Sequence, residues 1–288
     1  HGRRGILEAQ GLRYRFISKG RRLQVVCGDV VDFELRPGSE AAWVTAIRPR
    51  RNALARAPDR FRRGEVIAAN ISQLVAGSAP LPEPEPLLLD RHACTAEMLG
   101  CRLLIVCNKA DLAGTPPAIA SELAALGYPL LSVSTRNGSG LEALGTALAG
   151  HTSVLLGQSG VGKSSLINAL FPEAGAAVGE LSPTAGVGMH TTTAVLMYEG
   201  AQGMRLVDTP GVRDFLPAVP AERRLDSGFR EIHALAAGCR FSNCSHVHEP
   251  GCAVKAALET GAVSRRRHDS YLKLLAALEA TRPAPGAG

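Results

Sequence analysis

Two short motifs occur in this sequence in the reverse of their usual order. Asn-Lys-Ala-Asp at residues 108–111 precedes the run Gly-Gln-Ser-Gly-Val-Gly-Lys-Ser at residues 157–164. In ordinary GTP-binding domains this glycine-rich phosphate loop comes first, and the base-reading NKxD motif comes near the end. Because both motifs are strong, the reversed order predicts a circularly permuted GTP-binding domain.

The phosphate loop has the expected residue at each defining position. It follows a predicted apolar strand at residues 153–156 and precedes a predicted helix at residues 164–170. Its glycines allow a tight turn in which backbone N–H groups surround the phosphates. Lys163 is predicted to reach the β and γ oxygens, and Ser164 to bind Mg²⁺.

The base motif separates GTP from ATP, which a phosphate loop alone does not. The Asp111 carboxylate can accept hydrogen bonds from guanine N1–H and the exocyclic amine, groups that adenine does not present. Asn108 is predicted to brace the base and its loops, and the Lys109 stem to cover the ring. Ser134 is predicted to supply the last base-contacting loop. A lone NKxD is more often a surface turn, but its place after an apolar strand favours GTP binding.

Asp-Thr-Pro-Gly at residues 208–211 predicts the second phosphate motif. Asp208 would bond a Mg²⁺-bound water, and the Gly211 N–H would meet the γ-phosphate. Of the threonines at residues 191–193, Thr192 is predicted to close over Mg²⁺; the surface of a β-strand is the alternative for such a run.

The residue after Gly211 is Val212, where Ras-type GTPases carry a water-orienting glutamine. An apolar side chain cannot orient water, so unaided hydrolysis should be slow and another group must be brought in. His190, beside the threonines, is the candidate catalytic residue. The competing interpretation is a solvated loop histidine.

Three cysteines and one histidine cluster late in the chain: Cys239, Cys244, His246 and Cys252. Three thiolates and an imidazole are the ligand set of a closed, structural zinc site. Zinc bound there would order a segment that has little core of its own. The alternatives are scattered reduced cysteines, or a ligand role for the nearby His233 or His248.

Positive charge is concentrated near the N-terminal end. Residues 1–63 carry 15 Lys and Arg against 6 Asp and Glu, a charge of +9 that leaves −3 on the rest of a chain whose total is +6. Only five of the 32 basic residues are lysines, and the planar guanidinium of arginine suits phosphates and bases. This distribution predicts a nucleic-acid partner, with a solvated basic surface as the alternative.

Apolar runs and turns divide the chain into domains. Residues 1–50 alternate short β-like runs with turns and predict a small barrel, with an OB-fold as the best match. Residues 51–65 predict a linker. Residues 66–222 alternate strands with helices and predict an α/β domain that binds ligands at the carboxyl ends of a mainly parallel sheet. Residues 223–288 predict a mainly helical, zinc-binding domain.

The elements expected in detail are short. Strands are predicted at residues 23–27, 30–34, 42–47, 66–70, 103–107, 130–134 and 153–156. Helices are predicted at residues 91–100, 115–127, 141–149, 164–170 and 265–280. No stretch approaches the roughly 18 uncharged apolar residues of a membrane-spanning helix, and no secretory signal pattern opens the printed sequence. We expect a cytoplasmic monomer with no membrane partner.

Nearly the whole chain resembles the ribosome small-subunit-dependent GTPase A (RsgA) family. The matching sequences are the phosphate loop with its extension to Asn168, His-Thr-Thr-Thr at residues 190–193, Asp-Thr-Pro-Gly, and the cysteine cluster with Glu-Pro-Gly before Cys252. NKAD precedes them in the permuted order. Ala69-Asn70 and the Arg-Arg-Asn-x-Leu sequence at residues 50–54 also match.

The resemblance implies an OB-fold, a permuted GTPase domain and a C-terminal zinc domain, with GTP or GDP, Mg²⁺ and Zn²⁺ as cofactors. It also implies late maturation of the small ribosomal subunit, contact with its rRNA, and GTP hydrolysis that the subunit stimulates. By position, the implied nucleotide contacts are Asn108, Lys109, Asp111, Gly157, Gln158, Ser159, Gly160, Val161, Gly162, Lys163, Ser164 and Ser165, and the implied zinc ligands are the four residues of the cysteine cluster.

Two departures from the family pattern stand out. Met189 replaces the more usual basic residue before His190, which concerns an rRNA contact, and Thr135 replaces alanine after Ser134, which concerns the base loop. We hypothesise a switch in which GTP orders residues 186–193 and 208–216 and fixes the zinc and OB domains at an rRNA-binding angle.

Two other functions compete with a subunit-stimulated GTPase. Val212 leaves open an RNA-binding module that GTP regulates and that has negligible intrinsic hydrolysis. A P-loop ATPase or kinase is the third possibility, and the NKAD motif argues against it.

Overall fold

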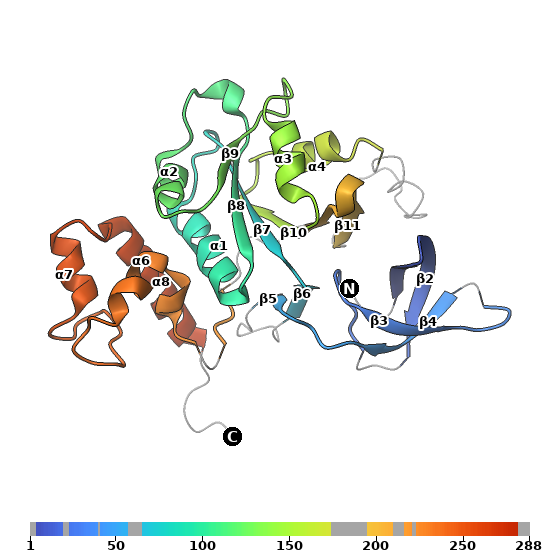
Figure 1. The fold of residues 1–288 in the computed structure, drawn as a ribbon, viewed down its shortest axis with the longest axis horizontal. Coiled ribbons are helices and arrows are strands. Elements are labelled where there is room, and N and C mark those ends of the chain that lie inside the picture. The colour runs from blue at the N-terminus through green and yellow to red at the C-terminus, as the bar shows by residue number, and fades with distance from the viewer. Residues whose placement is uncertain are drawn as a thin grey trace.

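The computed structural model describes residues 4–19, 23–39, 41–56, 65–173, 195–209, 216–220 and 223–281. A small N-terminal sheet lies at one end of the molecule, a central α/β unit lies in the middle, and a group of helices that includes the C-terminal one lies at the other end (Figure 1). Of the described helices, none is long and apolar enough to cross a membrane.

The centre is a six-stranded sheet with the strand order β11-β12-β10-β7-β8-β9. All neighbouring pairs run parallel except β11 with β12. The strands are β7 (Gln73–Ser78), β8 (Arg102–Cys107), β9 (Leu130–Ser132), β10 (Thr152–Gly157), β11 (Leu196–Glu199) and β12 (Arg205–Asp208).

Four helices cover the two faces of this sheet, namely α1 (Pro86–Leu99), α2 (Ala118–Ala125), α3 (Leu141–Leu148) and α4 (Lys163–Leu170). Successive strand residues point to opposite faces. In β7, Leu74 packs in the cluster that contains α1 and α2, and Val75 packs in the cluster that contains α3 and α4. Both faces are therefore buried, which explains why the strands read as continuous apolar runs in the sequence.

The strand order explains how motifs in reversed sequence order meet in space. The NKAD motif follows β8 and the phosphate loop follows β10, and both strands pair with β7. The carboxyl ends of these three parallel strands lie at the same end of the sheet, where ligands bind in open α/β folds. This arrangement agrees with the α/β domain and the parallel sheet that the sequence predicts.

One prediction in this region was wrong in detail. The strand expected at residues 66–70 is β6 (Glu65–Ala69), and it pairs with β5 (Ala53–Arg56) rather than joining the central sheet. The first strand of the central sheet is β7, which the sequence analysis missed. β5 also lies in the segment that was expected to be an irregular linker. β7 is short and fully buried, but its terminal residues, Gln73 and Ser78, are polar. Its sequence therefore does not have the apolar pattern of a buried strand.

Helix α1 begins five residues earlier than predicted. Pro86 occupies its first turn, where the missing N–H costs nothing and the fixed φ suits a helix. The helix ends at Gly100, whose left-handed backbone (φ 64°) lets its N–H return to Ala96 and Glu97 carbonyls. The other predicted helices of the central unit lie within a few residues of their expected ranges.

The N-terminal sheet has four described strands in the order β1-β2-β4-β3. They are β1 (Arg4–Ala9), β2 (Leu12–Ser18), β3 (Val31–Leu35) and β4 (Ala41–Ile47), and β2 pairs in parallel with β4. Their small core contains Phe16, Ala42 and Val44. The described strands form an open sheet, so the OB-fold barrel stays a prediction. A strand was predicted at residues 23–27. In this segment, Cys27 makes an isolated β-bridge to Ala68.

The C-terminal region is helical. It contains η3 (Leu225–Gly228), α6 (Arg230–Ala236), α7 (Ala253–Glu259) and α8 (Arg265–Thr281), and α8 agrees with the predicted final helix. Its core includes Phe229, Tyr271 and Leu274, and it also takes in Cys94 and Met98 from α1. Helix α1 therefore belongs to two cores, because its opposite side packs on the central sheet.

Candidate nucleotide site and metal cluster

The phosphate loop connects β10 to α4, and two of its glycines have a left-handed backbone conformation. Gly160 (φ 80°) and Gly162 (φ 91°) adopt backbone conformations that other residues rarely take. The Lys163 ammonium bends back over the loop and donates hydrogen bonds to the carbonyls of Gly157 (2.7 Å) and Gln158 (2.9 Å). A cation is thus held at the centre of a loop whose backbone suits phosphate oxygens.

The base motif is joined directly to the phosphate loop. The buried Asn108 side chain donates a hydrogen bond to the Val161 carbonyl at 3.1 Å, and Lys109 Nζ donates to the Gly160 carbonyl at 2.6 Å. A Cβ at Gly162 would lie only 2.3 Å from Asn108 Nδ2. Glycine is therefore required here both for its backbone angles and for the close approach of the asparagine.

Asp111 lies beside the loop that Ser134 begins. The Ser134 hydroxyl donates to Asp111 Oδ1 at 2.6 Å, and the Thr135 N–H donates to Asn108 Oδ1 at 3.3 Å. These bonds bring the two predicted base-binding segments together. Arg136 Nη1 lies 3.9 Å from Asp111 Oδ2. Arg136 was not predicted as a neighbour of Asp111, although Thr135, one of the two departures from the family pattern, lies next to it.

A proline-containing loop at residues 79–85 forms a further wall of the site, and sequence reasoning missed it. Lys109 Nζ donates to the Leu81 carbonyl at 2.8 Å. The Gln158 side chain donates to the Glu83 carbonyl at 2.9 Å and accepts from the Glu85 N–H at 3.0 Å. Both nucleotide motifs therefore form hydrogen bonds with the loop at residues 79–85. Gln158 forms its hydrogen bonds to this loop through its side chain.

Asp208 ends β12 beside the phosphate loop. It pairs across the sheet with Leu155 of β10, so its carboxylate lies at the same end of the sheet as the other motifs. Burial raises the pKa of the Asp208 carboxyl above its usual range, and the positive charge of Lys163 opposes that shift. His190, Thr192, Gly211 and Val212 lie outside the described residues.

The cysteine cluster has the dimensions of a tetrahedral metal site. The ligand atoms of Cys239, Cys244, His246 and Cys252 all lie within 4.8 Å of one another. His246 Nδ1 is 3.6 Å from the Cys239 sulfur and 3.5 Å from the Cys252 sulfur, and these two sulfurs are 3.9 Å apart. Tetrahedral zinc would separate two sulfurs by about 3.8 Å and a sulfur from a nitrogen by about 3.6 Å. The four predicted residues therefore fit Zn²⁺.

Surrounding groups orient the cluster from outside. His246 Nε2 lies 3.5 Å from Asp226 Oδ2, the carboxylate–histidine arrangement typical of metal ligands. The His246 carbonyl lies 3.0 Å from His268 Nε2, and the Ser245 carbonyl accepts a hydrogen bond from the Tyr271 hydroxyl at 2.9 Å. His233 and His248, the alternative ligands, are not among the four residues of the cluster.

Glu249 closes the loop that carries the histidine ligand. Its carboxylate accepts hydrogen bonds from the N–H groups of Ser245, Val247 and His248 and from the Ser245 hydroxyl. The bonds with Ser245 hold the pKa of the Glu249 carboxyl far below its usual range. These hydrogen bonds, all within residues 245–249, shape the loop that carries His246.

Residues 47–216 match the RsgA GTPase family. The protein named small ribosomal subunit biogenesis GTPase RsgA from Ectopseudomonas mendocina (strain ymp) is 42% identical over 277 residues, which cover 94% of this chain and 80% of that protein. The chain belongs to the RsgA GTPase family. The protein of the same name from Azotobacter vinelandii is 43% identical over 260 residues, covering 88% of this chain and 75% of that protein.

Solved structures of similar proteins agree with this membership. YjeQ from Thermotoga maritima has a TM-score of 0.70 and 28% identity, covering 96% of this chain and 93% of that one. YloQ, described as a circularly permuted GTPase, has a TM-score of 0.67 and 24% identity, covering 97% and 92%. The circularly permuted GTPase fold that the reversed motifs predict is confirmed, and the chain is a GTP hydrolase of the RsgA family.

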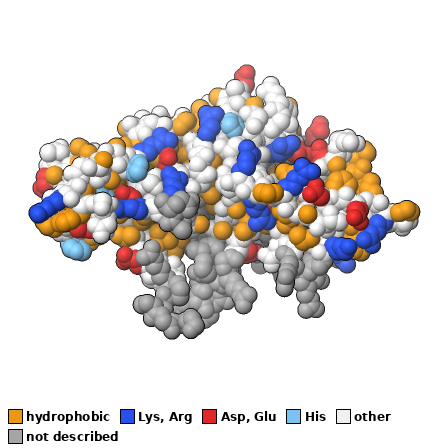
Figure 2. Space-filling view, turned by 60° about the horizontal axis from the view of Figure 1, so that its bottom comes forward, with side chains coloured by type: hydrophobic (Ala, Val, Ile, Leu, Met, Phe, Trp, Pro, Cys, Tyr) orange, Lys and Arg blue, Asp and Glu red, His pale blue; other side chains and the backbone are white. Residues whose placement is uncertain are grey.

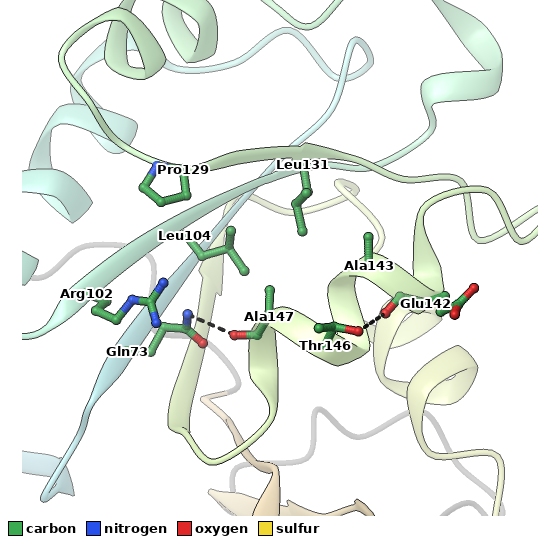
Figure 3. A pocket seen from close by; sticks show the side chains of 9 residues that line it. All are labelled: Gln73, Arg102, Leu104, Pro129, Leu131, Glu142, Ala143, Thr146 and Ala147. Carbon is green, nitrogen blue, oxygen red and sulfur yellow. Dashed lines mark hydrogen bonds between the residues drawn. The ribbon is translucent and has the colours of Figure 1, made fainter. Parts of the chain in front are cut away.

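A cavity of about 470 Å³ lies away from these motifs. Figure 3 shows its lining residues, which come from α3, from strands β7, β8 and β9, and from the residue before β9. Gln73 and Arg102 begin β7 and β8, whereas the phosphate loop follows the carboxyl end of β10. The buried polar residue of the cavity, Gln73, donates to the Ala147 carbonyl and accepts from the Ser153 hydroxyl. Because that amide is already engaged within the protein, the cavity does not compete with the carboxyl end of the sheet as the nucleotide site of this RsgA-family protein.

Proposed function

We propose that this protein binds the small ribosomal subunit and assists its late maturation, hydrolysing GTP to GDP and phosphate with stimulation by the subunit. The names of its relatives from Ectopseudomonas and Azotobacter support the ribosomal role. The observation that carries the nucleotide assignment is the hydrogen bond from Asn108 to the Val161 carbonyl. This hydrogen bond joins the guanine motif to the phosphate loop, although the two motifs occur in the sequence in the reverse of their usual order.

The nucleotide is bound from both ends of this site. Asp111 selects guanine, with Ser134 holding its carboxylate in place. When the triphosphate binds, Lys163 gives up its hydrogen bonds to two loop carbonyls and donates to the β and γ phosphate oxygens instead. The backbone N–H groups of the loop from Gly157 to Ser165 surround the phosphates, and the loop at residues 79–85 limits access from one side.

Hydrolysis requires groups that stabilise negative charge and orient water. Ser164 and Thr192 would hold Mg²⁺, and Asp208 would bind one of the waters of the ion. The ion would neutralise charge that develops on the phosphoryl oxygens. The Gly211 N–H meets the γ-phosphate, and His190 orients the attacking water in place of the glutamine that Val212 replaces. The small subunit supplies the stimulus that brings these segments together.

The remaining parts contact the ribosome. Cys239, Cys244, His246 and Cys252 hold a structural Zn²⁺, whose binding energy stabilises the loops around it. The N-terminal sheet is part of an OB-fold that binds rRNA. On the face seen in Figure 2, Lys and Arg side chains are spread along the molecule with Asp and Glu side chains among them. The excess positive charge of +9 on residues 1–63 supports binding to a polyanion at the N-terminal sheet. The protein acts in the cytoplasm as a monomer.

Turnover with purified small subunits tests this function. GTP hydrolysis is measured with the protein alone, with small subunits, and with large subunits as the matched control. Stimulation by small subunits alone is expected. A rate that is the same in all three conditions would exclude the proposed stimulation and would favour an RNA-binding role in which GTP is only a regulatory ligand.

A further inference from the structure

Helix α1 connects the phosphate loop to the C-terminal helical region. At its start, Glu85 occupies the N-cap position without a side-chain capping hydrogen bond, and the Glu85 N–H donates to the Gln158 side chain of the phosphate loop. One and a half turns further on, at a rise of about 1.5 Å per residue, Asp90 faces the C-terminal helices. The two contacts are thus on one rigid helix, separated by about 8 Å along its axis.

Asp90 is the centre of a buried ionic network. Its side chain is fully buried, and it accepts hydrogen bonds from Arg267 at 2.7 Å and from Arg266 at 2.5 Å, both on α8. Each arginine has a second acidic partner, namely Glu231 of α6 for Arg267 and Glu122 of α2 for Arg266. Buried charges tolerate few alternative geometries, because any lost hydrogen bond leaves an uncompensated charge.

The far end of α1 docks on the same region. Glu97 accepts a hydrogen bond from Arg230 at 2.6 Å, and Arg223 donates to the carbonyls of Glu97 and Met98. Cys94 lies against Gly228 so closely that a Cβ there would be 2.3 Å from its sulfur. Helix α1 is therefore joined to the C-terminal region at both Asp90 and its far end, and the loop that starts the helix is held by Gln158.

We propose that Gln158 is a positioning residue that couples the phosphate loop, through α1 and Asp90, to the docking of the C-terminal helical region. The inference rests on the nucleotide site proposed above. The route differs from the switch hypothesised for residues 186–193 and 208–216, because it runs through hydrogen bonds of described residues. Coupling is reciprocal, so a change in C-terminal docking must alter nucleotide affinity if nucleotide alters docking.

A double-mutant cycle on the full zinc-loaded chain tests the coupling. The affinity for a fluorescent N-methylanthraniloyl GDP is measured in Arg266→Gln and Arg267→Met, each alone and combined with Gln158→Ala. Arg265→Gln is the matched control, since Arg265 lies on the same helix turn and its ion pair among the described residues is with the exposed Glu259 at 3.6 Å. Zinc content verifies that the C-terminal region is folded, and Arg266→Gln decides the test if Arg267→Met loses zinc.

Arg266→Gln and Arg267→Met are expected to weaken nucleotide binding by about threefold to tenfold, although neither arginine belongs to the nucleotide site. In the Gln158→Ala background the same changes should have no further effect, and Arg265→Gln should have none in either background. Equal losses with and without Gln158, or no loss at all, would overturn the coupling. Failure of the unaltered protein to bind the probe would instead overturn the nucleotide site itself.

Discussion

Asp90 and Arg267, which are far apart in the sequence, form an ion pair of 2.7 Å in which both side chains are at most 1% exposed. The pair links the central α/β unit to the helices around the cysteine cluster. Removing one partner of a buried ion pair leaves the other charge buried and uncompensated. The resulting loss of folding stability is larger than the net stabilisation that the intact pair provides. The contact between these two parts of the molecule is therefore sensitive to single substitutions.

Asp90→Asn is expected to lower the free energy of unfolding by about 3 kcal/mol, because two arginines lose their shared anion and each keeps only one acidic partner. Urea denaturation followed by far-UV circular dichroism measures the change. Glu259→Gln is the control, because the pair of Glu259 with Arg265 is exposed, and its removal should cost no more than about 0.5 kcal/mol. Similar losses in both variants would mean that burial of the pair is unimportant.

Gly162→Ala is expected to abolish nucleotide binding, because its Cβ would lie 2.3 Å from Asn108 Nδ2 at a φ of 91°. Gly145→Ala is the matched control: Gly145 lies inside α3 with no atom near its missing Cβ, and alanine should stabilise the helix by about 0.5–1 kcal/mol. Fluorescent GDP titration and thermal melting measure the two effects. Retained affinity in Gly162→Ala would contradict the close approach of the two motifs.

Asp111→Asn should change the base preference from guanosine to xanthosine nucleotides. The carboxylate that accepts from guanine N1–H and the amine becomes an amide that can donate to the second carbonyl of xanthine. Loss of a charged hydrogen bond predicts GDP binding weakened by about 10- to 100-fold. Competition titrations with GDP and XDP measure the change, with Glu142→Gln as a carboxylate control outside the site. An unchanged ratio would remove Asp111 from base recognition.

Zinc should be present at one ion per chain and depend on the cluster. Cys252→Ser is expected to lose the metal and to destabilise the C-terminal helices, because the ligand Sγ lies 3.5 Å from His246 Nδ1 in the tetrahedral arrangement. Cys101→Ser is the control, since Cys101 is a free cysteine outside the cluster. Metal analysis and hydrogen exchange of residues 253–281 report the result. Zinc retained at full occupancy in Cys252→Ser would refute the ligand assignment.

His190→Ala should reduce subunit-stimulated GTP hydrolysis by about 10²- to 10⁴-fold while leaving GDP affinity unchanged, as expected for a group that acts on the attacking water. Single-turnover hydrolysis with saturating small subunits and GDP titration separate the two quantities. His233→Ala, a histidine on α6 outside the metal cluster, is the control. Undiminished turnover would exclude His190 from the mechanism.

Local patterns predicted much of the central unit. The phosphate loop, the helices α3 and α4, and strand β8 lie close to their expected ranges, because glycine positions and apolar periodicity specify backbone conformation over a few residues. β7 was missed since Gln73 and Ser78 make its ends polar, although both are buried. The pairing of β5 with β6 was missed for a different reason, because the sequence of a strand does not specify its partner.

The sequence alone determined which residue types each motif brings: the carboxylate proposed to select guanine, the glycine-rich loop proposed to hold phosphates, and four possible metal ligands within a short segment. Only the tertiary structure decided which of these groups meet. Strand β7 lies between β8 and β10, so that Asn108 reaches Val161, and α1 connects Gln158 to a network that contains Arg267. Short motifs fix their geometry through local backbone angles, whereas contacts between distant residues depend on strand order and helix packing, which no local pattern encodes.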